Sequence, residues 1–160
     1  MLTIGCFFIC LGFGILLKTM AMYPNERQAE TTDILSLMSD PYASPLRGKP
    51  AKLKGDLIGC GNAGYILGSD LQLQDSTGLI FLRYASRFGA IGNLLFGMKR
   101  VERLIGMQVT TLGWFRRGIS PCIDLIQFVS ESGTIVNSYH RFWSLLFGIF
   151  AIILGIILAF

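Results

Sequence analysis

Two long apolar segments lie at the ends of the chain, and every Asp, Glu, Lys and Arg lies between Lys18 and Arg141. Phe142 to Phe160 holds 19 uncharged residues, which as a helix would span about 28 Å, close to the thickness of a bilayer's hydrocarbon core. We therefore predict a C-terminal transmembrane helix within residues 137–160, after a short interfacial segment.

The N-terminal segment predicts a second transmembrane helix over residues 1–23. Met1 to Leu17 is uncharged, and Lys18 can extend its long side chain to the headgroups. A cleaved signal peptide is the alternative. It is less favoured because no basic residue precedes the apolar run and no small-residue cleavage site follows it.

Between the helices, the pattern first predicts a polar connector over residues 24–47, with a short helix from Thr31 to Met38 capped by Thr31 or Thr32. From residue 48 to 136 it predicts five strands with one helix, at about 90–105, between strands three and four. Apolar and polar residues alternate from residue 51 onward. This order favours a small OB-like β-barrel, because closing the sheet removes its exposed edges. An open sheet lying on the bilayer is the alternative.

Flanking charges predict the orientation of the chain. Lys18 and Arg27 follow the first apolar segment, and His140 and Arg141 precede the second. The positive-inside rule then places the barrel on the cytoplasmic or stromal side of a plasma or thylakoid membrane. In such a reducing compartment we expect Cys60 and Cys122 to be thiols in strands.

Small residues recur four apart in both apolar segments and predict a face where the helices pack closely, although such residues are common in membrane helices by chance. The predicted packing residues are Cys6, Cys10, Gly14, Ala151, Gly155 and Ala159. Aromatic and cationic residues mark the expected membrane interface. These are Lys18, Tyr139, His140, Arg141 and Trp143.

Composition agrees with a membrane protein and excludes several classes. The 160 residues are 52% hydrophobic and 15% charged, with a mean hydropathy of +0.55. This excludes a disordered tail and a secreted disulfide scaffold, and the length leaves no room for a multi-span transporter core. The composition does not identify an activity.

Several segments resemble one membrane-protein family. They are Asp40 to Gly48, Gly68 to Asp75 followed by Thr77-Gly78, Val101 to Gly106, Gly113 to Gly118, and Gly133 to Trp143. Together they resemble the C-terminal, non-peptidase, OB-like extension of HtpX-like integral-membrane zinc metallopeptidases of the cyanobacterial type. The resemblance implies a connection with membrane protein quality control.

The catalytic motif of that family is absent from this sequence. Its peptidase half uses H-E-x-x-H to bind zinc, whereas this chain has a single histidine, His140. No catalytic, metal or cofactor residue is therefore predicted, and we expect no enzyme activity unless an upstream or partner peptidase chain supplies it.

Basic and aromatic residues suggest an interaction surface, for an acidic partner, the bilayer or, least favoured, single-stranded nucleic acid. The candidates are Lys99, Arg100, Arg103, Trp114, Phe115, Arg116 and Arg117, with Tyr65, Phe81 and Tyr84 as further aromatics. A solvated helix face and an ordinary barrel core explain the same residues equally simply. The net charge of +4 does not discriminate, because anionic headgroups attract it as well.

These observations favour a non-catalytic, membrane-anchored protein that serves as an interaction or assembly subunit of a larger membrane complex. Its expected partners are the bilayer and other membrane-protein subunits. The alternatives are an accessory subunit or split half of an HtpX-like metalloprotease and, least favoured, an OB protein that binds single-stranded nucleic acid.

Overall fold

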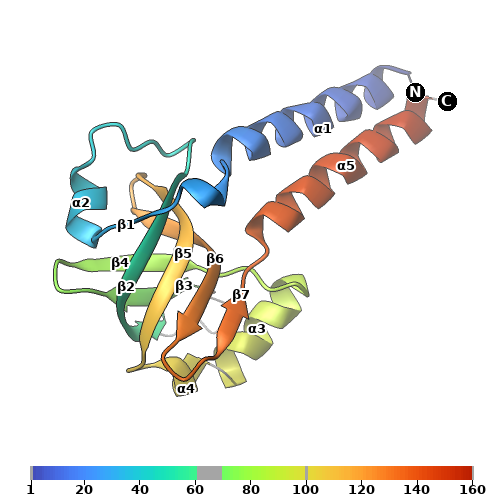
Figure 1. Ribbon diagram of the computed structural model, residues 1–160. Coiled ribbons are helices and arrows are strands. Elements are labelled where there is room, and N and C mark those ends of the chain that lie inside the picture. The colour runs from blue at the N-terminus through green and yellow to red at the C-terminus, as the bar shows by residue number, and fades with distance from the viewer. Residues whose placement is uncertain (1, 61–69, 100, 160) are drawn as a thin grey trace.

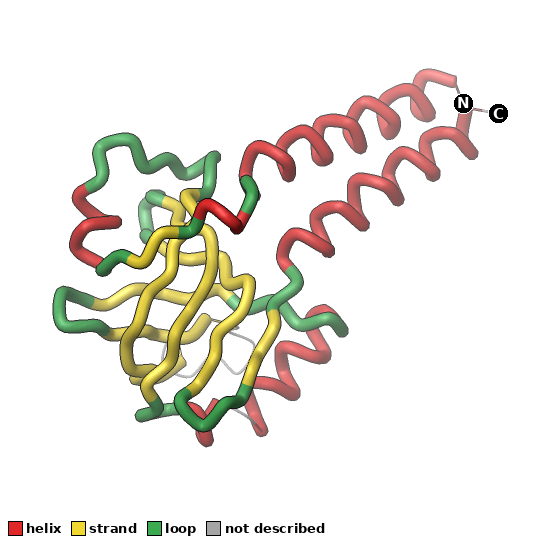
Figure 2. The backbone as a smooth tube through the Cα atoms, viewed as in Figure 1, coloured by secondary structure: helices red, strands yellow, loops and turns green. Residues whose placement is uncertain are grey.

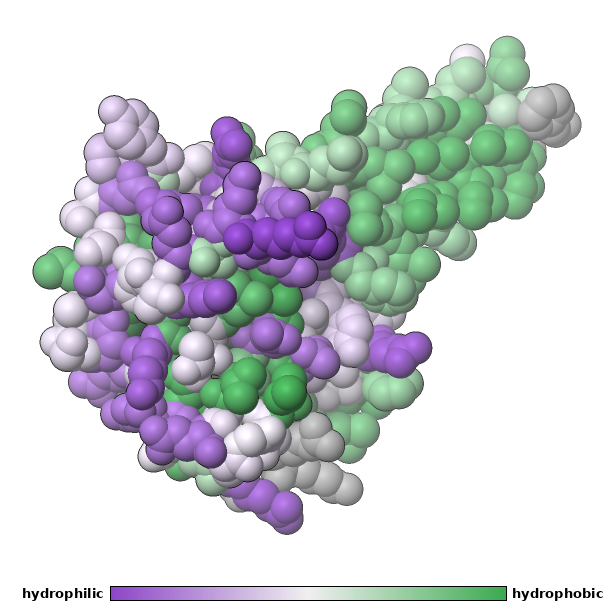
Figure 3. All heavy atoms as spheres, in the orientation of Figure 1, coloured by the Kyte–Doolittle hydropathy of each residue, from purple (hydrophilic) through white to green (hydrophobic). Residues whose placement is uncertain are grey.

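The computed structural model describes residues 2–60, 70–99 and 101–159, and consists of a β-barrel from which two long helices project side by side (Figure 1). The helices are α1 (Leu2–Met22) and α5 (His140–Ala159). They run antiparallel, so the start of α1 and the end of α5 meet at the tip farthest from the barrel (Figure 1). Each is long and apolar enough to cross a bilayer. Their surface is almost continuously hydrophobic, unlike that of the barrel (Figure 3).

The helices pack through small residues, but the predicted face of α1 is wrong. The buried residues are Gly5, Gly12 and Thr19 in α1 and Gly148, Ala151 and Gly155 in α5. In α1 these residues recur every seven positions, and in α5 the first and the last are seven apart, which is the spacing of a left-handed helix pair. Cys6, Cys10 and Gly14 point away from α5 and are exposed, because they lie on another side of the helix. The predictions for Ala151 and Gly155 agree with the packing, and Ala159 lies against Gly5.

Five strands form the barrel, as the hydrophobic pattern predicts. They are β2 (Lys49–Cys60), β3 (Asp70–Gln74), β4 (Leu79–Arg83), β5 (Gln108–Arg116) and β6 (Cys122–Ser130). Neighbouring strands follow the closed order β2-β3-β4-β6-β5 and back to β2. Only the β4–β6 pairing is parallel within this circuit. The closed OB-like arrangement is confirmed, and the open-sheet alternative is wrong.

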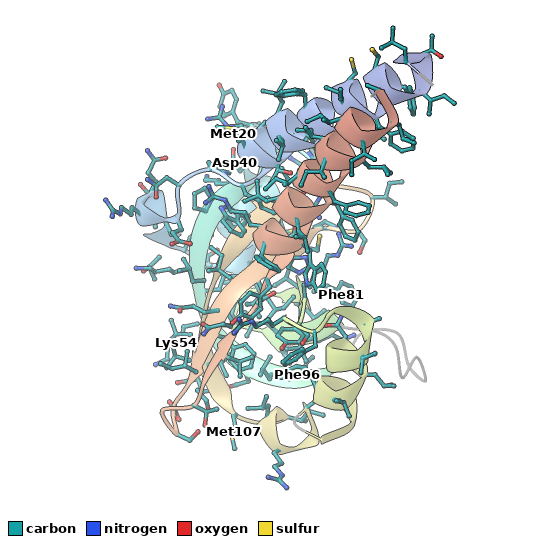
Figure 4. All side chains as sticks on the ribbon, turned by 90° about the vertical axis from the view of Figure 1, so that its right-hand side faces the viewer. Met20, Asp40, Lys54, Phe81, Phe96 and Met107 are labelled. Carbon is teal, nitrogen blue, oxygen red and sulfur yellow. The ribbon has the colours of Figure 1, made fainter. Side chains whose placement is uncertain are left out.

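The predicted helix between the third and fourth barrel strands is present as α3 (Gly89–Lys99) and α4 (Val101–Leu104). Alternate residues of the strands fill the core: Leu53 and Leu57 of β2 are buried, whereas Lys52 and Lys54, on either side of Leu53, are exposed. Phe96 lies on the side of α3 that faces the barrel and closes one end of this core (Figure 4).

The connector is more ordered than its polar sequence indicates (Figure 2). It contains a 3-10 turn (Glu26–Gln28), the strand β1 (Glu30–Thr31), which pairs in parallel with β2, and the helix α2 (Ile34–Ser39). The predicted short helix is present, but it begins at Ile34 and not at Thr31, and its cap is neither Thr31 nor Thr32. The cap is Asp33, whose Oδ1 accepts a hydrogen bond from the Ser36 N–H at 2.7 Å. Thr31 is excluded as the cap because it belongs to β1.

A further short strand, β7 (Ile135–Asn137), pairs antiparallel with β6 and is followed closely by α5.

Two hydrogen bonds hold α2 against the β3–β4 turn. There Asp75 Oδ2 accepts a hydrogen bond from the Ile34 N–H at 2.8 Å, and Thr77 Oγ1 accepts one from the Leu35 N–H at 3.1 Å. The connector is thus part of the folded domain.

Candidate functional site at the junction of the barrel and the apolar helices

A buried carboxylate, Asp124 of β6, lies at the centre of the junction and is 0% exposed. Nη2 of Arg116 lies 2.9 Å from each of its two oxygens. The Tyr23 hydroxyl, at the end of α1, donates a hydrogen bond to Oδ2 at 3.2 Å. Nη1 of Arg83 lies 3.8 Å from Oδ1. Two cations and one phenol therefore stabilise one buried negative charge.

Strand register brings these groups together. Arg83 of β4 is the parallel partner of Asp124, and Trp114 of β5 is its antiparallel partner. A bulge between Leu112 and Gly113 shifts the β5–β6 register just before this point. Because Ile123 and Leu125 fill the barrel core, Asp124 faces outward, where the end of α1 covers it.

The α1 side of the junction is closed by an aromatic pair. The rings of Tyr23 and Trp114 have centroids 4.7 Å apart, and Trp114 Nε1 donates a hydrogen bond to the Pro24 carbonyl at 2.9 Å. Trp114 is 3% exposed and Phe115 is 1% exposed. The predicted surface role of these two residues is wrong: Phe115 belongs to the barrel core and Trp114 to the junction.

The α5 side is tied to the segment that leaves β4. His140 Nε2–H donates to the Arg83 carbonyl, and Trp143 Nε1–H donates to the Ser86 carbonyl, both at 2.8 Å. The Tyr139 N–H also donates to the Ala85 carbonyl at 2.8 Å. Three of the predicted membrane-interface residues, Tyr139, His140 and Trp143, therefore attach the start of α5 to the barrel domain. Lys18 and Arg141 are exposed, and the interfacial role of all five stays a prediction.

The electrostatics of the junction favour a structural role for its polar groups. Burial lowers the pKa of the Arg116 guanidinium, but the charge and hydrogen bond of Asp124, together with Cys122 and Tyr23, raise it above its ordinary value. Burial and then the Asp124 charge raise the pKa of the Cys122 thiol. A protonated thiol is a poor nucleophile, and both oxygens of Asp124 are already engaged by Arg116. Arg116 Nε is buried without a hydrogen-bond partner in the described part of the chain.

An open groove of about 470 Å³ lies beside the junction, between α3 and β7. We call it the α3 groove. Its floor includes the stacked rings of Tyr84 and Phe96, whose centroids are 4.1 Å apart. Phe88 on its rim is 78% exposed and Ile135 is 60% exposed. This groove combines apolar walls with access from solvent.

The predicted basic and aromatic residues do not form one surface. Arg116 is engaged with Asp124, and Arg117 donates a hydrogen bond to the Asp40 carbonyl at 2.9 Å. Arg103 is exposed. Arg100 and the side chain of Lys99 lie outside the described residues.

The additional aromatics do not restore such a surface. Tyr84 is buried, Phe81 is half-buried on β4, and Tyr65 lies outside the described residues. The glycine-rich segment at residues 59–64, whose sequence lacks the features of a phosphate loop, falls almost entirely outside them as well.

Sequence reasoning missed Asp124, Tyr23 and Arg83. One signal was present: Asp124 is the lone charged residue in the strand from Cys122 to Val129, which is otherwise apolar apart from Gln127. A carboxylate in such a strand requires a partner when buried. The identity of its partners depends on strand pairing and helix docking, which the local pattern does not reveal.

In the described residues, no three or more His, Cys, Asp or Glu side chains are grouped so as to hold a metal ion. No protein family model matches this chain, and no curated protein matches it. Among solved structures, the hypothetical protein ygiW from E. coli is similar at 15% sequence identity, with a TM-score of 0.42. The match covers 64% of this chain and 90% of that one. The fold assignment accordingly rests on the strand order and pairing described above.

Proposed function

We propose that this protein is a non-catalytic subunit of a membrane complex, in which α1 and α5 anchor the barrel and the barrel binds another protein. The observation that carries the proposal is the buried junction around Asp124. Its charged groups, Asp124, Arg116 and Arg83, lie against one another where the end of α1 meets the barrel. These groups attach the barrel to the helices. The exposed apolar groove beside them is available to bind a partner protein.

The barrel is attached to both α1 and α5, which supports a role in binding a partner protein. Tyr23 and Trp114 fix the end of α1, while His140 and Trp143 fix the start of α5. A domain held at both ends keeps one orientation relative to the membrane. Partner binding then costs less orientational entropy than it would with a flexible tether.

The barrel would lie on the cytoplasmic or stromal side of a plasma or thylakoid membrane. The exposed Lys18 and Arg141 flank the two apolar helices on the barrel side, as the positive-inside rule favours. Lysine-directed labelling of sealed vesicles from outside and after permeabilisation would test this orientation. Efficient labelling only in vesicles whose cytoplasmic face is outward is the expected result.

The resemblance to HtpX-like extensions makes a membrane metallopeptidase the first partner to seek. In that case the chain would be an accessory subunit in protein quality control. Otherwise it would be a structural component of an unrelated assembly. Both versions keep the same biochemical role, which is recognition of a membrane protein by the barrel.

The test is native isolation. The affinity-tagged chain would be extracted in a mild detergent, and co-purifying proteins identified by mass spectrometry together with a zinc determination. Untagged membranes provide the control. Companions at fixed stoichiometry are expected; zinc with a peptidase companion would identify the accessory-subunit version. A chain that consistently migrates alone would contradict the proposal.

A further inference from the structure

The strand β7 pairs on one edge only within the described chain. The Ser138 N–H donates to the Ile126 carbonyl at 2.7 Å, and the Ser130 N–H donates to the Thr134 carbonyl at 3.0 Å. Backbone groups alternate in direction along a strand. Those of Ile135 and Asn137 therefore point away from β6, and no described residue bonds to them.

This free edge faces the α3 groove. Ile135 and Asn137 line one wall, while Leu95 and Phe96 of α3 line the other, and β7 lies next to α3 in Figure 1. Exposed strand edges are normally paired, covered or charged, since they template the addition of another strand. Here the edge opens into a space of about 470 Å³ with apolar walls.

The groove carries an uncompensated positive charge. Arg87 lines it and is exposed, and no described residue forms an ion pair with it. None of the described lining residues is acidic. An occupant with a carboxylate near Arg87 would complement this charge.

We propose that β7 accepts an added strand: an extended segment of a partner protein, with apolar side chains at alternate positions and a carboxylate at Arg87. Alternate side chains would rest on Leu95 and Phe96, and the segment's backbone would pair with Ile135 and Asn137. The proposal rests on the proposed function and specifies its binding site. Because Tyr139, immediately before α5, also lines the groove, the partner segment would run close to the membrane.

A lipid would satisfy the apolar walls but offers no alternating amide donors and acceptors along a strand edge. The unpaired backbone groups therefore favour a peptide over the bilayer as the occupant. The two occupants also differ in a testable way, since only a peptide loses affinity when its own amide groups are methylated.

The probe is a dye-labelled synthetic peptide of alternating threonine and valine that ends in aspartate, titrated into the full chain in detergent micelles. N-methylation of alternate amides should weaken binding about tenfold or more, the effect of losing one or two hydrogen bonds. Asn137→Pro removes an outward N–H that β6 does not use and should weaken binding similarly. Arg87→Gln should weaken it about threefold and remove the preference for the free carboxylate.

The matched control is Thr31→Pro in β1, the other short edge strand. The Thr32 N–H donates to the Lys52 carbonyl at 3.0 Å, so the neighbouring Thr31 N–H points away from β2. This variant carries the same substitution at an equivalent edge position and should bind the peptide like the parent chain. Ile135→Pro gives a second test at β7 should Asn137→Pro unfold, as judged by circular dichroism.

Three results would each overturn the proposal: no saturable binding, equal binding of the N-methylated peptide, or binding insensitive to both β7 prolines. Quenching of a dye at Phe88→Cys by brominated lipids in nanodiscs, in a chain that binds no peptide, would assign the groove to the bilayer. Different results would contradict the proposed function and the strand-addition site. A chain isolated without companions that still binds the peptide contradicts the subunit role, whereas companions retained in Asn137→Pro and Ile135→Pro contradict the strand-addition site.

Discussion

The hydroxyl of Tyr23 donates a hydrogen bond to the carboxylate of Asp124, 3.2 Å away and 101 residues later in the chain. Tyr23 directly follows the first apolar helix and Asp124 lies in the last barrel strand, so this bond joins that helix to the barrel domain. Asp124 is fully buried, and its charge would be costly without such partners. The barrel's attachment to the helices thus depends on one polar cluster.

Tyr23→Phe should reduce the free energy of unfolding by about 1 kcal/mol, because it removes one hydrogen bond and leaves a charged acceptor less satisfied. Asp124→Asn should cost more, about 3 kcal/mol, since it leaves Arg116 buried without its counter-ion. Chemical unfolding of the full chain in micelles measures both. Tyr42→Phe, at a tyrosine that is 93% exposed, is the control.

A double-mutant cycle completes this test. If the hydroxyl acts through Asp124, Tyr23→Phe should have a smaller effect in the Asp124→Asn background than in the parent chain. Additive effects of the two substitutions would show that the bond does not couple the helix to the barrel.

Gly12→Leu should separate α1 from α5, whereas Gly14→Leu should not. A Cβ added at Gly12 would lie 2.7 Å from the Gly148 carbonyl oxygen, with no space to relax. A Cβ at Gly14 meets nothing within 4 Å. Pulsed electron spin resonance between labels on the two helices would report the change. Equal distances in both variants would contradict the packing face described here.

The sequence correctly predicted the strands, which depend on local periodicity. It did not predict the burial of residues that the packing of α1 against the barrel covers. Alternation identified the barrel strands because one side of each faces the core. Trp114 and Phe115 break that rule: a bulge at Leu112 and Gly113 alters the register, and α1 covers Trp114 from outside, so both neighbours are buried.

The prediction of which face of α1 packs against α5 was wrong for a related reason. Small residues four apart show that close packing is possible, but they do not select among several small-residue faces. Gly5 and Gly12 were available on one side of α1, and Cys6 and Cys10 on another. The choice is made by where the barrel holds the helix ends, at Tyr23 and His140.

Acid should weaken the link between α2 and the β3–β4 turn. Burial raises the pKa of Asp75, but hydrogen bonds from Thr77, Ile34 and Gly78 together lower it below its ordinary value. A carboxyl with a lower pKa in the folded state stabilises the fold above its unfolded pKa of about 3.9. That stability is lost as the pH falls through the lower, folded-state pKa.

Urea unfolding between pH 6 and pH 3 measures this effect. Asp75→Asn should lower stability at pH 6 by about 1 kcal/mol, through weaker bonds to the α2 N-terminus, and the deficit should shrink toward pH 3. Glu131→Gln changes an exposed carboxylate on the β6–β7 turn and should not alter the pH profile. A constant deficit for Asp75→Asn across the range would contradict the assigned role of the charge.

Cys122 should react slowly with iodoacetamide at pH 8 in a chain whose other cysteines are replaced by serine. Burial and the Asp124 charge raise the pKa of this thiol, so little thiolate, the reactive form, is present at that pH. Shielding alone would also slow the reaction, but it would leave the pH midpoint of the rate at that of an ordinary thiol, about 8.5. The raised pKa instead moves the midpoint upward, and urea-unfolded chain should return it to the ordinary value. A folded chain with an unshifted midpoint would show that neither burial nor the Asp124 charge raises the pKa of this thiol.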